Sequence, residues 1–107
     1  MAGDSGRSLE QVLTPYLEIS GVNTAALVSS DGLPVASAGG AGVNLEALAV
    51  RAAILAAATA ELSSELGGRP RILALDNDGM GVILAPLTSD LLLVIVGAKK
   101  IMGLIRQ

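Results

Sequence analysis

The 107-residue chain has no cysteine, no histidine, no tryptophan and no phenylalanine, and its only aromatic residue is Tyr16. The absence of cysteine excludes disulfides, thiolate metal ligands and a cysteine nucleophile. The absence of histidine removes the usual components of zinc sites and of Ser-His-Asp catalysis. No set of residues suits general acid–base catalysis. The sequence therefore predicts a protein that is not an enzyme and that needs no metal and no cofactor.

Charged residues are also scarce, at 16% of the chain, and seven Lys and Arg against ten Asp and Glu give a net charge of −3. A net-negative chain without a basic block matches neither nucleic acid nor an anionic membrane surface. The longest run without a charge has 14 residues, from Gly32 to Leu45, whereas a bilayer span takes about 18–20 apolar residues. The start, Met1 to Gly6, lacks the basic and apolar regions of a signal peptide. We therefore expect a cytoplasmic domain without nucleic-acid binding or membrane insertion.

Apolar residues, by contrast, make up 51% of the chain. A domain of this size buries roughly two-thirds of the surface that its unfolded chain exposes, and its own core does not require so many apolar residues. We therefore expect part of the apolar surface to be covered by another protein, in the first place by a second copy of the same chain.

Apolar spacing and turn signals divide the chain into a flexible N-terminal tail, residues 1–7, and one domain, residues 8–107. The predicted fold is α+β, a five-stranded antiparallel sheet with helices on both faces in the order α-β-β-α-β-β-β-α. Pro15 is expected to kink the first helix, which starts at Ser8, or to end it early. The strands are predicted at 23–30, 33–38, 71–77, 80–86 and 91–96, with a long helix at 44–66 and a short helix at the C-terminus.

Two Asp-Gly pairs, Asp31-Gly32 and Asp78-Gly79, separate predicted strands. Both central residues of a type I′ turn need a positive φ, and Asp-Gly is a strong signal for that hairpin turn. We therefore expect a type I′ hairpin at each pair.

The long helix, which Asn44 is expected to cap, is apolar on two sides. One stripe with spacings of three and four residues is expected to face the core: Leu45, Leu48, Ala52, Leu55, Thr59, Leu62 and Leu66. The opposite side carries Ala47, Val50, Ile54 and Ala57. Because a surface helix normally needs one apolar stripe, the second side predicts a further contact.

Several segments follow one another in an order that is more specific than any one of them. They are Gly-Val-Asn at 21–23 leading into Ala-Leu-Val at 26–28, the hairpin Ser-Asp-Gly-Leu-Pro-Val at 30–35, the long Ala/Leu helix, Asp78-Gly79 with the apolar strand at 80–84, and the strand at 91–96 followed by Gly97. In these segments the chain resembles the Roadblock/dynein light chain family over residues 8–106. Among bacterial members it is most similar to the MglB type, which partners MglA-type Ras-like GTPases.

The resemblance implies a roadblock- or profilin-like homodimer in which the third strands pair into a continuous sheet and the long helices lie side by side on it. Carried onto this sequence, the dimer interface comprises Ala47, Arg71, Ile72, Leu73, Ala74 and Leu75. The paired helices are then the platform for a small GTPase, and the partner-binding residues are Glu46, Val50, Arg51, Ile54, Ala57, Ala58 and Glu61. Pairing the third strand also removes an exposed edge that favours aggregation.

The resemblance favours a dimeric, non-enzymatic regulator or scaffold of a Ras-like GTPase and leaves open whether GTP hydrolysis is stimulated. Arg51 is interpreted as a side chain at the rim of a helix contact rather than as an arginine finger. Two alternatives remain, a purely structural dimerisation adaptor of the dynein light chain kind and a small-molecule sensor domain. The absence of Phe, Trp and His that could line a pocket argues against the sensor.

Overall fold

The computed structural model describes the backbone of residues 2–40 and 42–106 and the side chains of residues 9–40 and 42–103. The elements are α1 (Ala2–Leu17), β1 (Val22–Ser29), β2 (Pro34–Gly39), α2 (Leu45–Glu65), β3 (Leu73–Asp76), β4 (Gly81–Pro86), β5 (Leu91–Gly97) and a 3-10 helix, η1 (Lys99–Arg106). This order of helices and strands confirms the prediction.

The five strands form one antiparallel sheet in the order β2-β1-β5-β4-β3. β5 is the central strand, and every residue from Leu92 to Gly97 is buried. Its uninterrupted apolar run is the pattern of a strand that is covered on both faces. β2 and β3 lie at the two edges, so β3 has a hydrogen-bonded neighbour on one side only.

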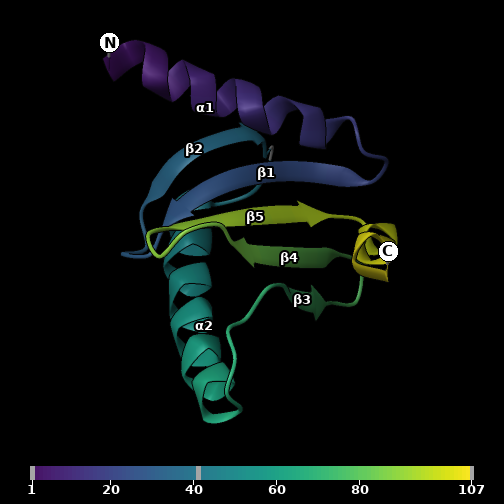
Figure 1. Ribbon diagram of the computed structural model, residues 1–107. Coiled ribbons are helices and arrows are strands. Elements are labelled where there is room, and N and C mark those ends of the chain that lie inside the picture. The colour runs from purple at the N-terminus through teal and green to yellow at the C-terminus, as the bar shows by residue number, and fades with distance from the viewer. Residues whose placement is uncertain (1, 41, 107) are drawn as a thin grey trace.

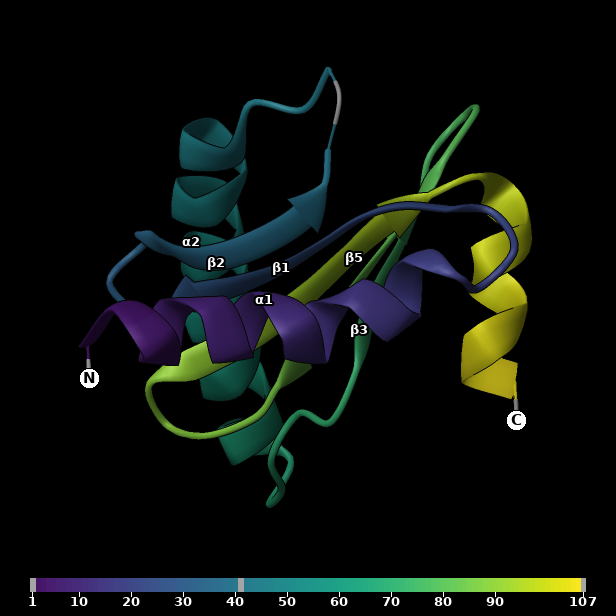
Figure 2. The ribbon, with the colours of Figure 1, turned by 90° about the horizontal axis from the view of Figure 1, so that it is seen from above.

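Helices cover both faces of the sheet, which confirms the predicted α+β architecture (Figures 1 and 2). On one face α1 and η1 pack against the sheet, and the buried residues there are Leu13, Ala25, Leu27, Ile83, Leu93, Ile95 and Ile101. On the other face α2 packs against the sheet, and the buried residues are Ala26, Val28, Ala49, Ala52, Leu84, Leu92, Val94 and Val96. The two clusters follow the alternation of side chains along each strand.

The first helix is longer than its apolar pattern indicated. α1 begins at Ala2, so the structure differs from the expected flexible tail at residues 1–7 over its described part. That segment contains Gly3 and Gly6, which are poor helix formers, and it has no apolar periodicity, so nothing in the pattern marked it as helical. α1 ends at Leu17, two residues after Pro15, in agreement with the predicted early end.

Both Asp-Gly pairs join antiparallel strands as predicted. Neither turn is type I′, because that turn needs a positive φ at the aspartate as well, and glycines are the only described residues with a positive φ. The first is a three-residue loop, residues 30–32, in which the Gly32 N–H donates to the Ser29 carbonyl at 2.9 Å and Gly32 has a φ of +89°. A type I turn followed by a left-handed glycine also closes hairpins. In the second, the Asn77 N–H donates to the Met80 carbonyl at 2.9 Å.

Candidate protein-interaction surface

The start of α2 is fixed by a side-chain cap. The side-chain oxygen of Asn44 accepts a hydrogen bond from the Ala47 N–H at 3.1 Å, and Asn44 itself has an extended backbone. This is the N-cap geometry that the sequence predicted, in which the cap satisfies a backbone donor of the first turn. The helix, Leu45–Glu65, also agrees with the predicted range to within one residue at each end.

The face of α2 that meets the sheet consists mainly of alanine. Its buried residues are Ala49, Ala52 and Ala53, with Leu45, Leu48 and Ala56 partly buried beside them. Leu55 and Leu62 were predicted to face the core, but they are 43% and 63% exposed. That prediction was wrong because the three-four spacing shows which residues share a side of the helix but does not decide which of two neighbouring apolar stripes meets the sheet.

The side of α2 that points away from the sheet carries the residues predicted to bind a partner, and we call this surface the platform. All seven of them are exposed: Glu46, Val50, Arg51, Ile54, Ala57, Ala58 and Glu61. Val50 is 46% exposed and Ile54 is 59% exposed. The structure thus brings the predicted residues together on one solvent-facing helix surface with apolar side chains at its centre, while their role in binding stays a prediction.

Beside the platform, three leucines form a second exposed strip, the leucine flank, which consists of Leu55, Leu62 and Leu66. At 100° per residue they fall within about 40° of one another around the helix axis. Figure 1 shows that α2 runs past β3, so that its last turns extend beyond the edge of the sheet. The leucines in those turns therefore have no strand of this chain beneath them.

The sheet edge at that end of the molecule is β3. It covers Leu73–Asp76 and is shorter than the predicted strand at 71–77, because four residues pair with β4. The predicted interface residues at this edge are Arg71, Ile72, Leu73, Ala74 and Leu75. Leu73 packs against the core, whereas Leu75 is exposed. Ala47 lies in the first turns of α2, away from β3 (Figure 1), so the structure does not bring it together with the other predicted interface residues.

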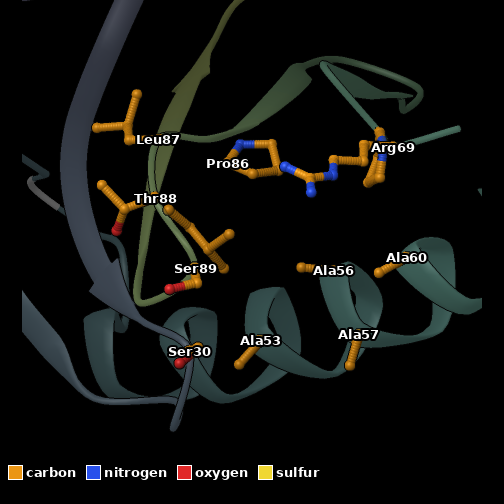
Figure 3. A pocket seen from close by; sticks show the side chains of 12 residues that line it. Ser30, Ala53, Ala56, Ala57, Ala60, Arg69, Pro86, Leu87, Thr88 and Ser89 are labelled. Carbon is orange, nitrogen blue, oxygen red and sulfur yellow. The ribbon is translucent and has the colours of Figure 1, made fainter.

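On the other flank of α2, the structure contains a groove of about 690 Å³ that the sequence did not predict (Figure 3). Four residues of α2 line it: Ala53, Ala56, Ala57 and Ala60. Pro86, Leu87 and Leu92 line it from the sheet and from the β4–β5 turn. Arg69, in the loop between α2 and β3, is the only charged residue of the lining and extends towards Pro86 (Figure 3). The sequence signal for the groove was the cluster of alanines between residues 53 and 60, which leaves room beside the helix.

One pair of charged side chains is in contact among the described residues, and it lies away from α2. The Nζ of Lys99 lies 3.4 Å from the Oδ1 of Asp76, which links η1 to β3. Because both side chains are exposed, this pair contributes at most about 1 kcal/mol to stability.

The described side chains contain no group of three or more His, Cys, Asp and Glu placed to hold a metal ion. Of the helices in the described part of the chain, none is long and apolar enough to cross a membrane.

Comparisons with known proteins agree with the earlier resemblance. The sequence profile of the Roadblock/LC7 domain matches residues 8–97, while no curated protein gives a sequence match. The solved structure of the gliding protein MglB from Thermus thermophilus is 26% identical, with a TM-score of 0.79 over 89% of this chain and 74% of that chain. An MglB structure with a tetrameric arrangement gives the same values. Myxococcus xanthus MglB, at 19% identity, has a TM-score of 0.83 over 94% of this chain and 77% of that chain.

Proposed function

The chain belongs to the Roadblock/LC7 domain family, and on this premise we propose that it is a dimeric, non-enzymatic regulator or scaffold that binds a Ras-like small GTPase of the MglA type. It acts in the cytoplasm and contributes binding surface rather than catalytic groups. The observation that carries the proposal is the exposure of apolar side chains on two sides of one helix, the platform and the leucine flank of α2.

The amount of exposed surface supports association. The single chain exposes 6773 Å², whereas a compact monomer of its mass, 10.7 kDa, is expected to expose about 5,500 Å². The surplus exceeds the roughly 800 Å² that each partner buries in an interface of standard size. A surplus of this size is enough for one interface of standard size, such as that with a second copy of the chain.

The two edges of the sheet differ in how open they are to a new strand. β2 begins at Pro34, which has no N–H to donate, and its pairing with β1 shifts register between Leu27 and Val28. Proline and bulges are devices that protect an edge from strand addition. β3 contains neither a proline nor a register shift. We therefore assign β3 as the edge at which two copies pair.

Pairing at β3 also explains the leucine flank. A second β3 beside the first extends the sheet beneath the last turns of α2, which otherwise extend beyond its edge (Figure 1). By two-fold symmetry the partner's α2 then lies antiparallel to this one on the same face of the sheet. In that arrangement Leu55, Leu62 and Leu66 are buried between the two helices and the joined sheet. The dimer thereby covers the leucines that were wrongly predicted to lie in the core of one chain.

The platform remains exposed in this dimer and is the proposed docking surface for the GTPase. Val50 and Ile54 form an apolar centre, and Glu46, Arg51 and Glu61 are charged residues around it. An apolar centre with a polar rim is the usual composition of a protein interface. Dimerisation doubles this surface by placing two platforms on the same side of the joined sheet.

The proposal is tested by titrating the purified protein with each Ras-like GTPase encoded in the same genome, loaded with GDP or with a non-hydrolysable GTP analogue. We expect one of them to bind, with an affinity that depends on the nucleotide. The rate of GTP hydrolysis, measured with and without the protein, shows whether binding also stimulates the reaction. Failure of every GTPase to bind in either state contradicts the proposal and leaves the structural dimerisation adaptor as the better account.

A further inference from the structure

The groove lies on the side of α2 that the proposed dimer leaves free. Ala60 and Leu62 are two residues apart, and so are Ala57 and Leu55. Two residues correspond to a rotation of about 200° around the helix axis, which puts the groove and the leucine flank on opposite sides of α2. A second copy that covers the leucines therefore leaves one open groove on each subunit.

The wall of the groove opposite α2 is held in place by hydrogen bonds. The Thr88 Oγ1 accepts from the N–H groups of Asp90 and Leu91, each at 3.1 Å. The Ser30 N–H donates to the Asp90 carbonyl at 2.9 Å and ties the β4–β5 turn to the β1–β2 turn. Because the turns on this wall are fixed to each other, the groove exists before any ligand binds.

The position of Arg69 follows from the way α2 ends. The Gly68 N–H donates to the Ser63 carbonyl at 2.9 Å, and the Gly67 N–H donates to the Ser64 carbonyl at 3.0 Å. Gly67 has a φ of +83°, and this pair of bonds is the Schellman motif that ends many helices. The motif reverses the chain at once, so that Arg69 lies above the last turns of the helix it has just left (Figure 3).

The lining combines one positive charge with an apolar floor. The chain as a whole carries a net charge of −3, so Arg69 is a local exception on an acidic protein. Among the described residues, Arg69 forms no ion pair; the single pair joins Lys99 and Asp76. A guanidinium beside apolar surface favours a ligand that has a carboxylate next to an apolar side chain, because an Arg–carboxylate pair is both strong and directional.

We propose that this groove receives a segment of the GTPase in which an acidic residue adjoins an apolar one, with the apolar side chain over the alanines and the carboxylate on Arg69. This inference rests on the proposed function and adds a second contact beside the platform. Besides Arg69, the polar side chains of the lining are the hydroxyl groups of Ser30, Thr88 and Ser89. The Thr88 hydroxyl already accepts two backbone hydrogen bonds, and the four alanines of α2 form an apolar floor. Such a lining suits a protein segment better than a small molecule that needs several converging polar contacts.

The test uses two substitutions that act on the groove by different means, in the full chain and with the GTPase found by the titration above. Arg69→Glu reverses the charge, and Ala60→Phe fills the groove from an exposed helix position. Each is expected to raise the dissociation constant at least about tenfold. Arg69→Glu removes the site of the partner's carboxylate, and Ala60→Phe removes the site of its apolar side chain. Arg69→Lys keeps the charge but loses the planar guanidinium fork, so it is expected to raise the dissociation constant by less than Arg69→Glu does.

Lys100→Glu provides the matched control, since it makes the same change of charge on η1, on the opposite face of the sheet. It is expected to leave binding unchanged, and all four variants are expected to sediment as the original chain does. If Arg69→Glu binds the GTPase as well as the original chain, the pairing with a carboxylate is wrong. If both groove variants bind normally while Ile54→Glu does not, the groove is not used and the proposed function still holds. If the original chain binds no GTPase, the proposed function fails first and this inference fails with it.

Discussion

Leu73 and Leu75 lie two residues apart on β3, so their side chains point to the same face of the sheet, yet Leu73 packs into the core and Leu75 is 53% exposed. The difference arises because α2 passes beside the start of β3 and not over the rest of the strand (Figure 1), so that Leu75, further along the strand, lies away from the helix. A leucine on a sheet face that has no covering helix indicates a missing layer. In the proposed dimer, the partner's α2 supplies that layer.

Leu75→Asp is therefore expected to prevent dimerisation while leaving the chain folded. An aspartate at this position places an unpaired charge in the interface, which costs several kcal/mol of association free energy. Sedimentation velocity gives the oligomeric state, and circular dichroism verifies the fold. The control is Leu33→Asp, the same substitution at an exposed leucine next to β2, at the other edge of the sheet. A dimer that persists in Leu75→Asp argues against pairing through β3.

Leu55→Glu distinguishes the observed orientation of α2 from the predicted one. A leucine in the core cannot be replaced by glutamate without unfolding, whereas Leu55 on the exposed flank can. We expect the variant to keep its circular dichroism spectrum but to dissociate into single chains at a higher protein concentration than the original chain. An unfolded variant restores the prediction that this leucine faces the core.

Ile54→Glu is expected to separate GTPase binding from dimerisation, because Ile54 lies at the centre of the platform and points away from the sheet. The dimer should sediment unchanged, and the dissociation constant for the GTPase should rise at least about tenfold, as for truncation of a central interface residue. Val50→Glu is expected to behave in the same way. Dissociation of the dimer by Ile54→Glu shows instead that the platform contacts the second copy.

Leu13→Ala tests the layer on the other face of the sheet. Leu13 is 1% exposed and is the buried residue of α1 in the described part of that helix. Its truncation should lower the free energy of unfolding by about 2–5 kcal/mol. Val12→Ala, at the neighbouring exposed position, should change it by no more than about 0.5 kcal/mol. Urea unfolding of both variants gives the comparison, and equal effects contradict the packing of α1 described above.

Much of the fold could be predicted because its boundaries are marked by local chemistry. Asn44 caps α2, the glycines at 67–68 end it, and the uninterrupted apolar run from Leu91 identifies a strand that is covered on both sides. Each of these signals acts within a few residues, which is why the order of elements and the layers agree with the structure. The Asp-Gly pairs placed both hairpins correctly, although the first uses a three-residue loop with only Gly32 in the left-handed region.

The parts that could not be predicted depend on contacts between distant segments. The spacing of apolar residues in α2 fits two rotations of the helix, and only the packing against β1 and β4 selects the one in which Ala52 and Ala53 are buried and Leu55 is exposed. The groove was missed for the same reason, since the position of Arg69 above Ala60 arises from the turn at the end of α2. Nothing in residues 2–7 distinguishes a helix from a tail, because that segment has no apolar side to bury.

Sedimentation equilibrium of the unmodified chain at micromolar concentration tests most directly whether the exposed leucines of α2 and the open edge of β3 form an interface between two copies. We expect a species of twice 10.7 kDa, with Leu75→Asp at the mass of one chain under the same conditions. A folded, well-ordered species of 10.7 kDa for the unmodified chain contradicts this expectation.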